Sequence, residues 1–114
     1  MSTLSTHVLD TQRGRAASGL PLSLEAQGQA GTWASLSRGV TDSDGRVREL
    51  LPSGGRLEPG TYRLTFDTGT YFRAQGIRGF YPSVTVVFEV TAADEHYHVP
   101  LLLSPFGYST YRGT

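Results

Sequence analysis

Three histidines are the side chains of this sequence best suited to acid/base or metal chemistry. His96 and His98 are separated by a single residue, and His7 lies near the other end of the chain. If one strand holds the pair, both imidazoles point to the same side, because side chains alternate along a strand. An imidazole moves protons near neutral pH, and a His-x-His pair with a third ligand can also bind zinc. The spacing alone leaves acid/base catalysis and a zinc site equally open.

Two arginines stand where they could complement the histidines. Arg46 follows an Asp-Gly turn signal, and Arg112 lies in the last stretch of the chain. If the last strand, expected over residues 108–112, continues its alternation to the end of the chain, Tyr108, Thr110, Arg112 and Thr114 share one face. By position alone, however, Arg46 is an ordinary solvated turn residue and Arg112 belongs to a frayed terminus. Spacing therefore does not assign either arginine a role.

The composition excludes several other mechanisms. The 114 residues contain no cysteine and no lysine, so a thiol nucleophile, a thiolate zinc site, a disulfide and a Schiff base are all absent. Ten acidic residues balance ten basic residues, giving a formal net charge of zero. Without a basic excess, we expect neither a nucleic acid nor a membrane surface as partner. Chemistry is left to histidine, arginine, carboxylates and hydroxyls.

The elements that must position these residues are short strands. Gly and Pro recur throughout the chain as turn signals, and the stretches between them alternate with a period of two. Residues 70–75 do not alternate and predict one short helix. Eight strands predict an all-β sandwich of two packed antiparallel sheets. We expect these strands at residues 4–10, 22–26, 33–40, 46–48, 61–66, 83–91, 97–104 and 108–112.

Length and apolar patterning predict one domain over residues 1–114 and a cytoplasmic location. A chain of this size fits a single core. The first residues lack a basic segment followed by a long apolar stretch, so no signal peptide is indicated. The longest apolar runs, residues 86–88 and 101–103, are far too short to span a membrane. The lack of cysteine agrees with a reducing compartment.

Six stretches resemble, in order and in spacing, the 5-hydroxyisourate hydrolases, the transthyretin-related enzymes of urate degradation. The resemblance covers nearly the whole chain. The plasma hormone carrier transthyretin shares that fold but lacks the enzyme's histidines and its C-terminal tetrapeptide. The family usually closes with Ser, whereas Thr114 keeps the hydroxyl here and adds a methyl group. The matching stretches are residues 5–11, 19–22, 41–46, 60–62, 96–102 and 111–114.

The resemblance implies a prealbumin-like, transthyretin-like sandwich that assembles as a homotetramer, a dimer of dimers with active sites in the cleft between the dimers. The implied reaction hydrolyses the cyclic amide of 5-hydroxyisourate to 2-oxo-4-hydroxy-4-carboxy-5-ureidoimidazoline, with no metal and no cofactor. His96 is not among the residues that we carry over as essential. The catalytic residues implied are His7, Arg46, His98 and Thr114, and the substrate-binding residues are His7, Arg46, Tyr111 and Arg112.

These residue types suit amide hydrolysis. The reaction needs an activated water, stabilisation of an oxyanion and a proton for the leaving nitrogen. We expect His98 to be the general base and His7 to position water or relay the proton, although the two roles could be exchanged. Arg46 or Arg112 would bind carbonyl oxygen.

Two other classes of protein remain as alternatives to an enzyme. A non-enzymatic transthyretin-like ligand carrier would use the same cleft but would not need the ionisable groups. A structural β-sandwich module like the carboxypeptidase regulatory domains is the second alternative. Residues 42–46 and 59–62 fit that architecture as well, but it would not explain both chain ends.

Overall fold

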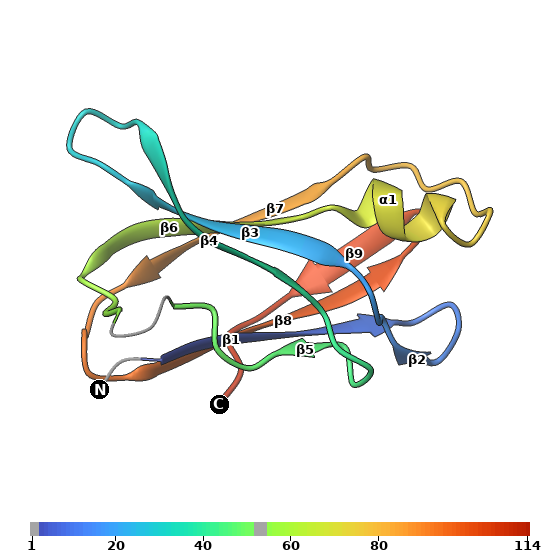
Figure 1. Cartoon of the computed structure of the whole chain (residues 1–114), viewed down its shortest axis with the longest axis horizontal. Helices are drawn as coiled ribbons and strands as arrows, with labels where there is room; N and C mark the ends of the chain where they lie inside the picture. The colour runs from blue at the N-terminus through green and yellow to red at the C-terminus, as the bar shows by residue number, and fades with distance from the viewer. Residues whose placement is uncertain (1–2, 52–54) are drawn as a thin grey trace.

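Two stacked β-sheets form the body of the computed structural model, which describes residues 3–51 and 55–114 (Figure 1). One sheet has the order β2 (Arg15–Ala16), β1 (Thr3–Asp10), β8 (His96–Ser104) and β9 (Gly107–Thr110), with β5 (Arg46–Val47) also paired to β1. The other has the order β4 (Trp33–Val40), β3 (Pro21–Gln27), β6 (Gly60–Phe66) and β7 (Val84–Val90). A short helix, α1 (Thr68–Arg73), follows β6. Within the described ranges, no helix has the length and apolar character needed to cross a membrane.

The predicted all-β sandwich is confirmed, with differences at the ends of elements. Every predicted strand has a counterpart, and the two-residue strand β2 was missed because it is too short to show a period. The helix begins at Thr68, before the predicted start, because the Asp67 carboxylate accepts the Thr70 backbone N–H at 3.2 Å and caps it. The last strand ends at Thr110 and not at Arg112.

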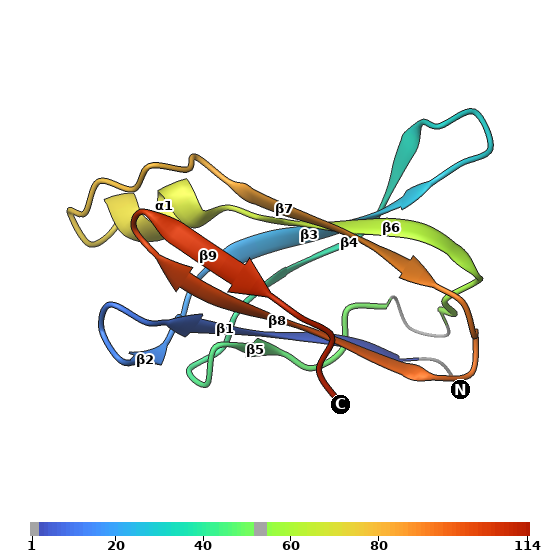
Figure 2. The ribbon, with the colours of Figure 1, turned by 180° about the vertical axis from the view of Figure 1, so that it is seen from behind.

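The expectation of purely antiparallel sheets was wrong for one pair of strands. β1 and β8 run parallel, in a register that extends from Thr3 opposite His96 to Asp10 opposite Leu103. Figure 2 shows their arrows pointing the same way. The chain between them passes through the whole second sheet, and such a long crossover connection is what a parallel pair requires. Alternation reveals which face a residue occupies but not the direction of its neighbour.

Burial alternates along β1 as predicted. The inner residues of the strand are buried, whereas Ser5, His7 and Leu9 are half-buried on the outer face. Burial of apolar side chains between the sheets is the main favourable term that holds them together. The largest fully buried side chains include Phe66, Phe72, Leu24, Leu64 and Leu101.

A buried carboxylate ends β1 and connects it to the helix. Asp10 is 1% exposed and accepts the Tyr71 hydroxyl at 2.7 Å and the Arg13 backbone N–H at 3.1 Å. Burial, reinforced by the neighbouring Asp10 carboxyl group, raises the pKa of Tyr71. Because the hydrogen bonds satisfy both carboxylate oxygens, the cost of burying the group is offset. This contact holds the end of β1 that follows His7.

Candidate active site

The parallel pairing of β1 and β8 brings histidines from both ends of the chain onto one outer face. Ser5 stands opposite His98, and His7 stands opposite Pro100. His7 and His98 are therefore diagonal neighbours on adjacent strands. On its other side, His7 stands opposite Arg46 of β5. Three of the residues predicted to be catalytic, His7, Arg46 and His98, thus occupy one patch of the sheet.

A turn stabilised by the Asp42 carboxylate places Arg46 at this patch. Asp42 Oδ1 accepts the backbone N–H groups of Asp44 at 2.9 Å and Arg46 at 3.0 Å. The hydrogen bond from the Arg46 backbone is the main reason why the pKa of Asp42 lies below its usual value. Carboxylates that close a turn on their own backbone are common after strands. Arg46 follows the turn directly and is the first residue of β5.

Gly45 is required in the same turn. Its backbone has a φ of +75°, a conformation that favours glycine. Its carbonyl accepts the Val8 backbone N–H at 2.8 Å, and a Cβ at position 45 would lie 2.4 Å from the Val8 carbonyl oxygen. The turn can therefore approach β1 this closely only because residue 45 has no side chain.

The environment of His98 favours its neutral form. Burial is the largest cause that lowers the pKa of His98, and the positive charges of Arg46, His96 and His7 lower it further. A hydrogen bond with the Ser5 backbone acts in the opposite direction. A neutral imidazole keeps the lone pair that a general base needs. His98 is thus prepared to accept a proton at neutral pH.

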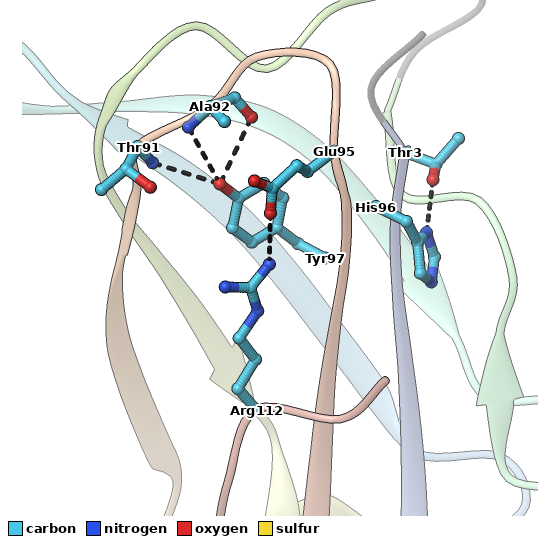
Figure 3. Close-up of polar contacts among 7 residues, drawn as sticks. All are labelled: Thr3, Thr91, Ala92, Glu95, His96, Tyr97 and Arg112. Atoms are coloured by element: carbon cyan, nitrogen blue, oxygen red, sulfur yellow. Dashed lines mark hydrogen bonds and ion pairs between the residues drawn. The ribbon is translucent and has the colours of Figure 1, made fainter.

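Hydroxyl groups connect the two histidines of β8. Ser5 Oγ lies 2.8 Å from His98 Nδ1 and 3.4 Å from His96 Nε2. His96 Nδ1 is hydrogen-bonded to the Thr3 hydroxyl (Figure 3). The two rings are nearly parallel, with centroids 6.2 Å apart, which confirms that both point to one side. We did not predict roles for Ser5 and Thr3, although the same alternation that selects His7 places both on its face.

The end of the chain folds back onto His98. The Gly113 backbone N–H donates to the His98 carbonyl oxygen at 2.9 Å. A Cβ on Gly113 would lie 2.6 Å from His98 Cδ2 and 3.2 Å from Pro100 Cγ. Thr114 follows this contact and is exposed. The tail therefore reaches the histidine through the bridge at Gly113, and not through the longer strand that we expected.

In this single chain, Arg112 contacts Glu95 and Tyr97 and not the patch of His7, Arg46 and His98. Its guanidinium donates to Glu95 Oε1 at 2.8 Å and lies 4.6 Å above the Tyr97 ring (Figure 3). Tyr97 is buried and sits between His96 and His98 in β8, so its side chain points to the opposite face. The alternation that would have joined Arg112 to Thr114 does not apply, because β9 has already ended.

Tyr111 lines an apolar groove beside the same chain end. The groove has a volume of about 280 Å³ and lies between β7 and the tail, with Phe88, Tyr97 and His98 among its lining residues. Tyr111 itself is 58% exposed. The structure thus places Tyr111 next to His98 along the groove but leaves its ring largely uncovered.

The three histidines do not converge on a common point. Among the described residues, no group of three or more His, Asp or Glu side chains is placed to hold a metal ion. His96 is hydrogen-bonded to Thr3 and His98 to Ser5. The arrangement of His7, His96 and His98 in this single chain therefore adds no support to the zinc site that the spacing left open.

Comparisons with known proteins identify the family of this chain. A model described as "HIUase/Transthyretin family" matches residues 4–113. The 5-hydroxyisourate hydrolase 2 of Rhizobium meliloti (strain 1021) is 50% identical over 117 residues, covering 97% of this chain and 95% of that protein. The solved structure of Klebsiella pneumoniae 5-hydroxyisourate hydrolase is 36% identical, with a TM-score of 0.85 over 98% of this chain and 99% of that chain. Sea bream transthyretin, solved in complex with thyroxine, is 33% identical, with a TM-score of 0.91 over 98% and 95%.

The two-sheet sandwich, which matches both a hydrolase and a transthyretin, defines the class of the protein as transthyretin-like. The family model spans nearly all of this sequence, and the chain belongs to the HIUase/Transthyretin family. Both a hydrolase and a transthyretin match the fold closely. The fold by itself therefore does not distinguish an enzyme from a carrier, and the residues of the site must do so.

The contact between Gly113 and His98 leads to a first prediction. Gly113→Ala places a methyl group where the His98 ring lies, so either the ring turns or the tail detaches. We expect faster hydrogen exchange at the residue 113 amide and shifted His98 ring resonances in NMR spectra. Gly28→Ala is the matched control, because its Cβ would meet only the Thr32 carbonyl oxygen at 3.6 Å and the Thr32 hydroxyl at 3.8 Å. Unchanged resonances in the Gly113 variant would show that the tail is not packed on His98.

Proposed function

We propose that this chain is a 5-hydroxyisourate hydrolase that opens the cyclic amide of its substrate in the cytosol. The observation that carries the proposal is a His98 with a lowered pKa on the same sheet face as His7 and Arg46. Relatives named 5-hydroxyisourate hydrolase that are 43–50% identical over nearly the whole chain support the same activity. A carrier of apolar ligands has no need for three ionisable groups on one face, and a structural module has no need for a tail packed on a histidine.

The proposed reaction begins with proton transfer from water to His98. The hydroxide that forms attacks the carbonyl carbon of the ring amide, and Arg46 donates hydrogen bonds to the resulting oxyanion. His98, now charged, returns the proton to the ring nitrogen as the C–N bond breaks, so atoms and protons balance. His7 positions the water or relays the proton. No metal or cofactor is part of this mechanism.

We assign the residues of the chain end to substrate binding and to water. Thr114 follows Gly113, which touches His98, and its hydroxyl would hydrogen-bond the attacking water or the imidazole. Tyr111 and Arg112 would bind the planar substrate. Because Arg112 is paired with Glu95 in the single chain, it must exchange that carboxylate for the substrate. A guanidinium can do so without changing its charge.

We also propose that the active form is a homotetramer, a dimer of dimers. β7 and β9 are the last strands of their sheets, so both sheets have an open edge on the same side of the sandwich (Figure 2). Exposed strand edges and apolar patches mark association surfaces. Val87 of β7, Tyr108 of β9 and Tyr111, which follows β9, are 43% or more exposed on these edge elements.

The activity prediction uses freshly prepared 5-hydroxyisourate and protein dialysed against a chelator. We expect catalytic amounts of protein to accelerate the loss of substrate absorbance. His98→Asn should lower kcat by roughly 100-fold or more, the usual contribution of a general base, because asparagine cannot accept the proton. Arg38→Gln, at an exposed position on the other sheet, serves as the control. Loss of activity on dialysis that zinc restores would contradict the metal-free mechanism.

The pH dependence follows from the lowered pKa of His98. A base must be neutral to act, so kcat/KM should rise with pH as His98 loses its proton. Since burial and the neighbouring positive charges lower that pKa, the midpoint should lie below about 6.5, the value of an unperturbed histidine. The profile is measured between pH 4.5 and 8.5 in buffers of constant ionic strength. A midpoint above the unperturbed value would remove His98 from the role of general base.

The proposed tetramer can be tested by measuring the mass of the protein in solution. Light scattering at micromolar concentration should give a tetramer. Val87→Asp adds a charge to an exposed valine on the edge strand β7 and should shift the protein towards smaller species, because a charge at an apolar interface is costly. Ser35→Asp, at an exposed position of β4 on the opposite edge of the same sheet, is the matched control. A monomer mass for the unmodified chain would argue against the tetramer and against a site completed by assembly.

A further inference from the structure

We propose that Ser5 and His96 are positioning residues that select the tautomer of His98, so that its Nε2 atom carries the lone pair that acts on water. The inference rests on the proposed function of His98 as a general base. Neither Ser5 nor His96 is among the catalytic residues that the sequence predicted.

Four side chains form a continuous row of polar contacts on the outer face of β1 and β8. Thr3 is hydrogen-bonded to His96 Nδ1, and Ser5 Oγ lies 3.4 Å from His96 Nε2 and 2.8 Å from His98 Nδ1. The register explains this order, because Thr3 stands opposite His96 and Ser5 opposite His98. The contact between Ser5 and His96 is the longest of the three. Within this row His96 is exposed and His98 is half-buried.

Proton counting allows three arrangements of this row, because the Ser5 oxygen has two lone pairs but only one hydrogen. A neutral imidazole has one N–H and one lone pair, and a hydroxyl group has one hydrogen. In the first arrangement, His98 Nδ1–H donates to Ser5 Oγ, the Ser5 hydroxyl donates to His96 Nε2, and His96 Nδ1–H donates to the Thr3 hydroxyl. In the second, every donor and acceptor is reversed. In the third, His98 Nδ1–H and His96 Nε2–H both donate to Ser5 Oγ, and the Thr3 hydroxyl donates to His96 Nδ1. The tautomers of His96 and His98 are therefore coupled, because the single hydrogen of Ser5 can serve the lone pair of only one ring.

The first and third arrangements make His98 a base at Nε2, whereas the second does not. With Nδ1–H engaged by Ser5, the free lone pair is on Nε2, next to Cδ2, the ring atom closest to the tail at Gly113. In the reversed arrangement Nε2 would carry a hydrogen and could not take a proton from water. After proton uptake, the charged ring still donates Nδ1–H to Ser5. A partner that orients a catalytic imidazole in this way acts through the tautomer and not through direct contact with the substrate.

His96 also affects the pKa of His98 through its charge. The groups that lower the pKa of His98 by their charge come from three strands: Arg46 from β5, His7 from β1 and His96 from β8. Replacing His96 with an uncharged residue removes one of them. The acid limb of the pH profile should then shift to higher pH, because His98 holds its proton more tightly.

The first test reads the tautomer directly and does not depend on activity. In ¹⁵N NMR spectra of the unmodified protein above the His98 pKa, Nδ1 should give the signal of a protonated nitrogen and Nε2 that of an unprotonated one. Ser5→Ala should populate the Nε2–H form, and Ser5→Thr, which keeps the hydroxyl, should restore the original signals. An Nε2–H tautomer in the unmodified protein, or identical spectra in the Ser5→Ala variant, would overturn the proposal.

The second test is a double-mutant cycle on turnover of 5-hydroxyisourate. His96→Phe, which keeps a ring but has no nitrogen, should lower kcat by roughly 10-fold with little change in KM, because its effect passes through Ser5. In a Ser5→Ala background the same change should cost nothing further at pH 8. Ser35→Ala, an exposed hydroxyl on the other sheet, is the control for Ser5→Ala. Independent, additive losses would overturn the coupling, whereas a chain that does not accelerate substrate loss at all would instead refute the proposed function.

Discussion

The parallel pairing of β1 with β8 is the interaction on which the rest of the site depends. It joins the first strand of the chain to one near its end, and its register places Ser5 beside His98 and His7 one step further along. The buried Asp10 carboxylate, bound to Tyr71, holds the far end of β1. Without this pairing the histidines at the two ends of the chain have no reason to meet, because nothing local connects them.

The site concentrates groups that are or can become positively charged on one face, although the whole chain has no net charge. Arg46, His7 and His96 all disfavour a charged His98, so the cluster works against protonation of its central member. This arrangement is unfavourable for stability but useful for a general base, since it keeps a lone pair available at neutral pH. A carbonyl-rich substrate that develops negative charge would relieve the repulsion in the transition state.

Function in this fold is decided by few side chains. Sea bream transthyretin and the Klebsiella hydrolase superpose on this chain with TM-scores of 0.91 and 0.85, so the backbone is common to proteins with different names and different uses. In this chain, ionisable side chains lie on the outer face of the β1–β8 sheet, and the tail reaches His98. Gly113 allows that tail to reach His98, whereas the ion pair with Glu95 holds Arg112 on the other side of the strand.

Local patterns in the sequence were sufficient to predict the strands and the turn that leads to Arg46. They were also sufficient to predict which side of their strands His7, His96 and His98 occupy. Each of these follows from a period of two or from turn chemistry that neighbouring residues contain. Only the tertiary structure decided that β1 pairs with β8 in parallel, that Ser5 and Thr3 contact the histidines, and that Arg112 binds Glu95. These contacts join residues far apart in the chain, and the pairing of distant strands depends on packing of the whole sandwich, which no short segment encodes.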